Sequence, residues 1–416
     1  MIDSILVFSR STPQHVIGGM ETLAWNLAVQ LAGHVRQVRL VTTALPGTDG
    51  PFEAEGVEVV PLPGTAPGRY SAAWWAESRR YWEALPAPPD VVLSVSAGAY
   101  SVARTRHAAT VSSAGRAAWA RAARTRSGRS GTPFVLQAHG TSAMEFGSKL
   151  RAGNLRSLAT SPKNLLALPR DFTRYRNFDR IVAVGERVVE SLTGRPLRWS
   201  VPPERVSLIP NGVRPADFGF DPAARAEVRA RLGIGDEVIA IGCVGRLHVQ
   251  KRLDRAIGVA AALRDRGLGE RFRFLLVGGG PDGPRLRRLA GRLGVRDMVT
   301  FVGPVDPTEV PRYHSGADVS LLTTARLEGL PMTVLESLAC GLPCVVPAGA
   351  IGGTSLGPVL HQVDPDDPEA VAEALRAAVR TPGGRASLLP AELTLDHCAR
   401  SYLALFEELR GRSGPP

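Results

Sequence analysis

The chain has 416 residues, 44% of them hydrophobic, and a formal net charge of +11. This length predicts two or three domains with a large buried core. No uncharged apolar run reaches the roughly 18–20 residues that a bilayer-spanning helix needs, and the first ten residues lack the basic segment of a signal peptide, so we expect a cytoplasmic protein. The four cysteines show no Cys-x-x-Cys spacing, which argues against a structural zinc and favours free thiols in a reducing compartment.

The first half of the chain alternates between short apolar runs and amphipathic segments. Unbroken apolar runs predict buried strands, whereas leucines spaced three to four residues apart predict helices. We therefore expect strands at residues 5–8, 38–42, 57–61, 90–95, 133–139, 178–184 and 206–213, and helices at residues 20–32, 186–192 and, in an Ala- and Arg-rich stretch, from about residue 102.

Two features of this half lie where parallel sheets place ligands, at the carboxyl ends of strands. Gly18 and Gly19 occupy a predicted strand-to-helix turn, where glycines let the backbone approach a ligand closely; a plain tight turn is the alternative. His139 ends a predicted buried strand and is a candidate catalytic residue, although a structural role is an open alternative for a lone histidine.

The alternation restarts after irregular chain at residues 217–222, which we interpret as an inter-domain hinge. The second half predicts strands at residues 237–244, 272–277, 298–302, 319–324 and 344–347, and helices beginning near residue 253 and at residues 332–340 and 395–409. Repeated strand–helix units of this kind indicate an α/β fold built on parallel sheets.

Two basic and two acidic side chains in this half suggest a nucleotide sugar. Arg246 and Lys251 bracket a strand-to-helix loop, a place that favours phosphate. Glu328 and Glu336 flank the start of the helix at residues 332–340, whose free N–H groups and dipole also favour phosphate. Glu328 can then bind hydroxyls of a sugar and Glu336 those of a ribose. Two solvated surface glutamates are the alternative interpretation.

Residues 278–283 read GGGPDG, which has the form G-x-G-x-x-G of a dinucleotide-binding loop. Such a loop requires an acid about 20 residues further on, at the end of the next strand. Asp297 has this spacing but precedes the strand predicted at residues 298–302, so we do not expect a nicotinamide or flavin enzyme. The sequence also lacks a Walker phosphate loop, a His-Glu-x-x-His metal motif and a Gly-x-Ser-x-Gly nucleophile motif.

Taken jointly, several motifs resemble the retaining GT-B glycosyltransferases of family 4. They are Gly18-Gly19, Gly245-Arg246 with Lys251, VGGGPDG at 277–283, FVGPV at 301–305 and EGLPMTVLESLACGLP at 328–343. The resemblance implies two Rossmann-like domains that face each other across a cleft. Residues 1–205 would bind the acceptor, residues 206–392 the nucleotide-sugar donor, and residues 393–416 would form a helix and tail that cross back to the first domain.

The resemblance also implies roles for individual residues. Arg246 and Lys251 would contact the donor diphosphate, Glu328 the donor sugar and Glu336 the ribose. The remaining implied contacts are phosphate binding by backbone amides at Gly329, Leu330, Met332 and Thr333, closure over the donor by Gly18 and Gly19, a base near Val305, and His139 beside the transferred sugar. The sequence departs from relatives at Pro331, which lacks an N–H where many have glycine, and at Gly185, where many have serine.

The implied reaction transfers a hexosyl unit, with retention, from a UDP- or GDP-linked sugar to an acceptor hydroxyl, without a metal or another cofactor. The acceptor would be a lipid-linked glycan or a small molecule, in polysaccharide assembly or in antibiotic and other natural-product glycosylation. HGTSxxE at residues 139–145 resembles exopolysaccharide transferases, which favours the former. A nucleotide-sugar 2-epimerase and a catalytically silent sugar-nucleotide-binding partner stay open as alternatives.

The net charge is concentrated between Ser101 and Arg170, which hold twelve basic residues and one acid, Glu145. One hypothesis is peripheral contact with the anionic inner face of the membrane, or with a lipid-linked pyrophosphate. The alternative is a solvated arginine face that reflects GC-rich codon usage. We expect no nucleic-acid partner, because no aromatic platform accompanies these arginines.

Overall fold

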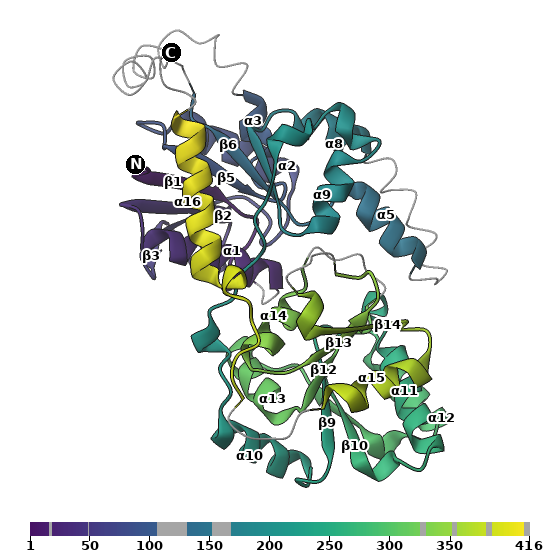
Figure 1. The fold of residues 1–416 in the computed structure, drawn as a ribbon. Helices are drawn as coiled ribbons and strands as arrows, with labels where there is room; N and C mark the ends of the chain where they lie inside the picture. Colours follow the sequence, from purple (N-terminus) through teal and green to yellow (C-terminus); the bar gives the residue numbers. More distant parts are fainter. Residues whose placement is uncertain are drawn as a thin grey trace.

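The computed structural model of the chain contains two β-sheets, one above the other in Figure 1, each flanked by helices on both faces. It describes residues 1–15, 19–48, 50–105, 131–151, 168–324, 330–351, 356–379 and 385–411. The GT-B architecture of two Rossmann-like domains is therefore confirmed at the level of the fold.

The first sheet has the strand order β3-β4-β2-β1-β5-β6-β7-β8, and its strands pair in parallel except β3 with β4. Along β1, Ile5 and Val7 point into one hydrophobic cluster, whereas Leu6 and Phe8 point into another. This alternation gives the sheet two buried faces. The strands are β1 (Ser4–Phe8), β2 (Gln37–Thr43), β3 (Phe52–Ala54), β4 (Val57–Leu62), β5 (Val91–Val95), β6 (Phe134–Ala138), β7 (Arg180–Ala183) and β8 (Val206–Leu208).

Helices from both ends of the chain cover one face of this sheet. They are α1 (Gly19–Ala32) and α16 (Leu395–Gly411), whose apolar side chains share one cluster. The opposite face is covered by α2 (Ala72–Glu83), α3 (Tyr100–Thr105), α5 (Ser142–Arg151), α8 (Leu168–Tyr175) and α9 (Glu186–Thr193). The rest of the basic segment that begins at Ser101 lies largely outside the described residues.

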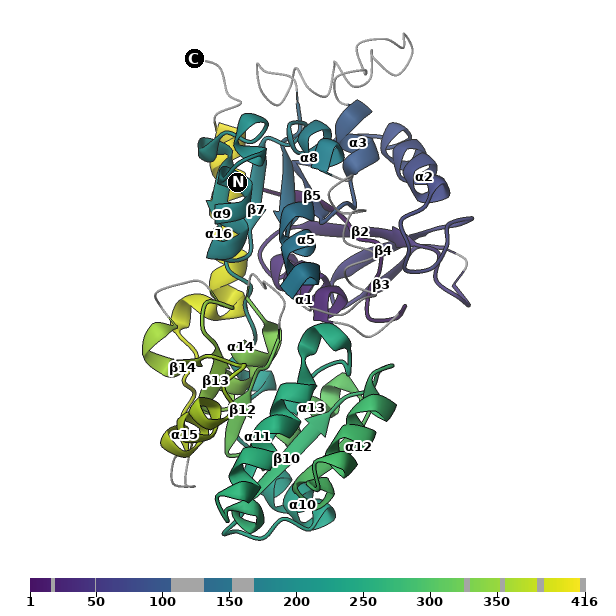
Figure 2. The same ribbon diagram turned by 90° about the vertical axis from the view of Figure 1, so that its right-hand side faces the viewer.

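The second sheet is parallel throughout, with the order β11-β10-β9-β12-β13-β14. Its strands are β9 (Ile239–Val244), β10 (Phe272–Val277), β11 (Val299–Gly303), β12 (Val319–Leu321), β13 (Cys344–Pro347) and β14 (Leu360–Val363). One face packs against α11 (Leu253–Asp265), α12 (Gly283–Arg292) and α15 (Pro368–Ala378), and the other against α10 (Pro222–Leu232), α13 (Val310–Gly316) and α14 (Met332–Ala339) (Figures 1 and 2). The strand order reverses between β9 and β12, and ligands of such sheets bind at the carboxyl ends of the strands there.

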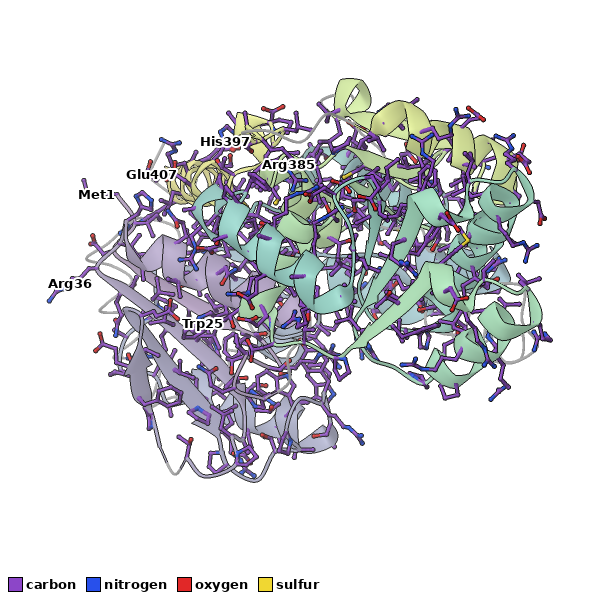
Figure 3. All side chains as sticks on the ribbon, turned by 90° about the horizontal axis from the view of Figure 1, so that it is seen from below. Met1, Trp25, Arg36, Arg385, His397 and Glu407 are labelled. Carbon is purple, nitrogen blue, oxygen red and sulfur yellow. The ribbon has the colours of Figure 1, made fainter. Side chains whose placement is uncertain are left out.

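The last helix returns to the first domain, as predicted. Tyr402 and Phe406 of α16 are fully buried in the first domain's core. Glu408 pairs with Arg180 of β7 at 2.9 Å, and Arg410 pairs with Asp90 at 3.1 Å. Viewed from below, His397 and Glu407 mark this helix near Met1 (Figure 3).

The predicted boundary between residues 205 and 206 is wrong by a few residues. Val206, Ser207 and Leu208 form β8, which pairs in parallel with β7 and so belongs to the first sheet. The strand predicted at residues 206–213 is also shorter than expected. Its apolar residues do not reveal which sheet supplies the pairing partner.

The four cysteines are free thiols, as predicted, and all four are buried. Burial raises the pKa of the Cys243, Cys344 and Cys398 thiols to about 12, so these three side chains stay protonated at neutral pH. Among the helices within the described residues, none is long and apolar enough to cross a bilayer.

Candidate active site

The loop that follows β9 carries Arg246 and Lys251, and a second loop holds its backbone in place. Gly245 N–H donates to the carbonyl of Val277 at 2.9 Å, and Leu247 N–H donates to that of Gly279 at 2.9 Å. A Cβ atom on Gly278 would lie 2.1 Å from the Gly245 carbonyl oxygen. The glycine run at residues 278–280 therefore lets its backbone approach the Arg246 loop closely and accept a hydrogen bond from it.

Hydroxyl groups from the strand on the other side also fix this loop. Thr323, just after β12, donates its hydroxyl to the carbonyl oxygen of Lys251 at 2.8 Å, and Thr324 donates to that of Gln250 at 3.2 Å. Arg255 in turn donates to the Thr323 carbonyl at 3.1 Å. The segment that bears Lys251 is thus anchored to both strands that flank the reversal of strand order, β9 and β12.

Arg246 itself is exposed, and no carboxylate of the described residues forms an ion pair with it. Lys251 is half-buried in the 3-10 turn Val249–Lys251. The next residue, Arg252, has a left-handed backbone at φ 49° and is the N-cap of α11. A non-glycine residue in this conformation carries strain of about 1 kcal/mol, which the surrounding contacts must offset.

The helix start predicted near Pro331 is present. Pro331 lies just ahead of α14 rather than in its first turn, and the helix runs from Met332 to Ala339. Within the described residues, no acceptor is recorded for the N–H groups of Met332 and Thr333. The sequence predicts phosphate binding by these donors and the positive helix end.

Glu336 lies one turn into α14 and faces a buried histidine. Its carboxylate is 3.7 Å from Nε2 of His314, and its side chain is 17% exposed against 1% for His314. The other ring nitrogen of His314 lies 3.4 Å from the Ser337 hydroxyl. Sequence analysis gave no role to His314, which lies on α13 and meets Glu336 only through the packing of the two helices.

His139 follows β6 in the first domain and is half-buried. Its Nε2–H donates to the Gln137 side-chain oxygen at 3.0 Å, which fixes the orientation of the ring. Gln137 is 1% exposed and also faces the buried Tyr402 hydroxyl of α16, although the two make no hydrogen bond of standard geometry. Gln137 therefore links the returning helix to His139.

Two polar contacts join the two domains on this side. Gln250, next to Lys251, donates its amide to Glu145 at 3.4 Å; Glu145 lies on α5, six residues after His139. Arg187, in the first turn of α9, donates to the Gly349 carbonyl at 3.0 Å. The His139 segment and the Lys251 loop are consequently neighbours in space.

The other predicted site residues divide into two groups. Leu330 is buried in the cluster around α14, Val305 packs against the cluster around α10, and Gly19 is the first residue of α1. Gly18, Glu328 and Gly329 lie outside the described residues. The structure thus brings together the Lys251 loop and the His139 segment, and the roles of all predicted site residues stay predictions.

Two family models match the chain: Glycosyl transferases group 1 over residues 224–388 and Glycosyltransferase Family 4 over residues 17–217. The chain belongs to this glycosyltransferase family. It is 34% identical over 183 residues to the D-inositol 3-phosphate glycosyltransferase of Actinosynnema mirum, a match that covers 42% of each chain. It is 37% identical over 158 residues to a GDP-mannose-dependent alpha-(1-6)-phosphatidylinositol monomannoside mannosyltransferase of Mycobacterium tuberculosis, covering 36% of this chain and 40% of that relative. The chain thus spans about two fifths of the length of these two curated relatives.

Solved structures with the same fold match along nearly the whole chain. Sucrose-phosphate synthase from Thermosynechococcus elongatus matches with a TM-score of 0.72 and 18% identity, over 99% of this chain and 100% of that one. The Anabaena HepE protein, solved in complex with UDP, matches with a TM-score of 0.66 and 14% identity, over 98% and 100% of the two chains. These likenesses support the GT-B fold of this family member.

Proposed function

We propose that this family member is a retaining glycosyltransferase that moves a hexosyl unit from a nucleotide-diphosphate sugar to an acceptor hydroxyl. The observation that carries the proposal is the anchoring of the Lys251 loop between β9 and β12, where the strand order reverses. Gln250, the residue before Lys251, contacts Glu145 on α5 of the first domain. A donor diphosphate at this point would meet basic side chains and lie between the two domains.

The charges account for bond cleavage in this proposal. A departing nucleoside diphosphate gains negative charge while the sugar becomes oxocarbenium-like. Arg246, Lys251 and the N–H groups at the start of α14 stabilise the leaving group, and each such donor contributes a factor of about 10²–10³ in rate. The proposed reaction therefore needs no metal ion.

In the proposed reaction, the acceptor hydroxyl attacks the anomeric carbon from the face that the phosphate leaves, and that phosphate accepts the hydroxyl proton. The anomeric configuration of the sugar is therefore retained. Glu328 would orient the donor sugar and Glu336 the ribose, as the resemblance implies. His139 would contact the transferred sugar in the orientation that Gln137 holds. Gly18, Gly19 and Gly329 would close the donor site, with the base beside Val305.

The donor is proposed to be UDP- or GDP-linked and the acceptor a polyol hydroxyl, in a lipid-linked glycan or a small molecule. The relatives include enzymes named as a GDP-mannose-dependent mannosyltransferase and as D-inositol 3-phosphate glycosyltransferases, and the Anabaena structure holds UDP. These names fit our proposed pathways, cell-surface polysaccharide assembly or natural-product glycosylation in the cytoplasm.

Thermal melting against UDP-, GDP-, ADP- and dTDP-sugars and NAD(P), without added metal, tests the donor class. A ligand at 100 times its Kd stabilises the folded protein by about 2.7 kcal/mol, so one nucleotide sugar should raise the melting temperature by several degrees. Stabilisation by NAD(P) alone would contradict the proposal.

Donor turnover without any acceptor would instead indicate a 2-epimerase. The anomeric configuration of a transfer product tests retention.

Replacing Thr323 with valine should lower transfer about tenfold and weaken donor affinity. Valine keeps the shape of threonine but cannot donate to the Lys251 carbonyl, so the loop loses one anchor. Initial rates and donor titrations measure both effects. Thr193→Val removes a comparable hydroxyl, which bonds within α9, and should change neither quantity.

Replacing Gln137 with leucine should lower kcat about 10- to 100-fold and leave the donor KM nearly unchanged, because the His139 ring loses its fixed orientation. Steady-state kinetics with the donor varied separate the two parameters. Tyr402→Phe removes only the neighbouring hydroxyl and serves as the packing control. Equal losses of kcat in both variants would indicate a packing defect rather than a positioning role for Gln137.

A further inference from the structure

The first domain exposes an unusual aromatic side chain. Among the described residues, three large apolar side chains are exposed: Met1 at 95%, Trp199 at 71% and Leu208 at 43%. Trp199 lies between α9 and the edge strand β8, and Leu208 is the last residue of β8. Leu197 is fully buried and anchors the 3-10 turn Leu197–Trp199, so the backbone is held while the indole faces solvent.

Four exposed arginines lie near this indole along the chain or at the end of α8, which packs against the turn Leu197–Trp199. Arg195 and Arg198 flank the buried Leu197, and Arg205 donates to the Arg176 carbonyl at 3.4 Å, which brings the end of α8 alongside. None of the four forms an ion pair with a carboxylate of the described residues, and Glu204 is the exposed acid among them. We call these four arginines and Trp199 the Trp199 surface.

A second group of exposed arginines shows that arginine alone does not make such a surface. Arg287, Arg288 and Arg292 on α12 are also exposed. The nearby aromatic ring, Phe301, is half-buried and its face is covered by Arg287 at 4.3 Å. A codon bias toward arginine accounts for α12, but it does not account for an exposed indole among the arginines.

We propose that the Trp199 surface docks the protein on an anionic lipid bilayer. Indole rings favour the membrane interface, and long arginine stems cover apolar surface while their charges meet lipid head groups. This inference does not depend on the transferase reaction.

The position of the surface leaves the candidate active site accessible. Arg187, in the first turn of α9, contacts Gly349 of the second domain. The Trp199 surface begins beyond the opposite end of the same helix, at Arg195, so docking there does not cover the inter-domain contact. Nucleic acid fits the surface less well, because a single exposed ring offers no series of stacking platforms.

Co-sedimentation of the full chain with vesicles tests this proposal. Wild type should bind vesicles of equal parts phosphatidylcholine and phosphatidylglycerol at about 0.05 M salt and be released at about 0.5 M, and it should ignore pure phosphatidylcholine. Trp199→Ala should lower partitioning on the order of tenfold. Arg198→Glu with Arg205→Glu should lower it at least about 25-fold, since each basic residue near the surface contributes about fivefold.

Arg288→Glu with Arg292→Glu is the matched control, because it changes the net charge equally in the second domain. This pair should retain most of the binding. Equal loss of vesicle binding in both double variants would show that binding depends only on net charge, and would overturn the proposal. Absence of binding to anionic vesicles would overturn it as well. Trp199-dependent retention on transfer RNA in place of vesicles would also overturn it. Melting curves with the donor confirm that each variant is folded, independently of lipid binding.

Discussion

Replacing Arg246 with alanine should lower the rate of sugar transfer by about 10²–10³ without a loss of stability. The side chain is exposed and makes no ion pair with the described carboxylates, whereas the backbone around it is held by Val277 and Gly279. Truncation therefore leaves the loop in place and removes only the charge that we propose to face the leaving diphosphate. Single-turnover rates with saturating donor measure the effect, and melting temperatures should agree with wild type.

Arg288→Ala is the control for this experiment, because it removes an equally exposed arginine from the same domain. Arg246→Lys is informative as well. Lysine keeps the charge but lacks the planar fork that binds two phosphate oxygens at once, so an intermediate rate is expected. Transfer by Arg246→Ala at the wild-type rate would remove Arg246 from the mechanism and leave the helix start and Lys251 to carry the charge.

The sequence predicted those parts of the fold that depend on local patterns. The apolar runs at β1, β9 and β10 and the Pro–Gly signals around α14 are short-range features, and the structure confirms an element at each place. The helix α10 was missed because residues 217–222 were interpreted as a hinge. The signals were present, since Asp221 caps the first turn at 2.8 Å and Gly233 ends the helix at φ 64°.

The contacts that hold the candidate site could not be predicted in the same way. Thr323 and Lys251 are 72 residues apart, and they meet only because β12 pairs with β9. The sequence showed two threonines at a strand end but not which loop they would face. The glycines at residues 278–280 likewise matched a dinucleotide-binding pattern that the sequence did not complete. Their role in packing against the neighbouring Arg246 loop is visible only in the structure.

Replacing Asp318 with alanine should destabilise the second domain by about 3–5 kcal/mol, because it leaves buried guanidinium groups without their counter-charge. Asp318 precedes β12 and pairs with Arg225 at 2.7 Å and with Arg229 at 3.0 Å. The exposed fractions of the three side chains are 8%, 13% and 4% in that order. The Ala240 N–H donates to the same carboxylate at 2.8 Å, so the loss also frees a backbone donor of β9.

Urea unfolding at neutral pH, followed by probes in each domain, measures this loss, which should appear in the transition of the second domain. Asp217→Ala is the control: it breaks an ion pair with Arg214 in which both side chains are at least 40% exposed, and exposed pairs contribute about 0–1 kcal/mol. A loss below about 1 kcal/mol for Asp318→Ala would contradict the buried-charge argument. The expected loss also bears on function, because β12 runs from Asp318 toward Thr323. A strand fixed at its amino end by two arginines presents, at its carboxyl end, the hydroxyl that holds the Lys251 loop.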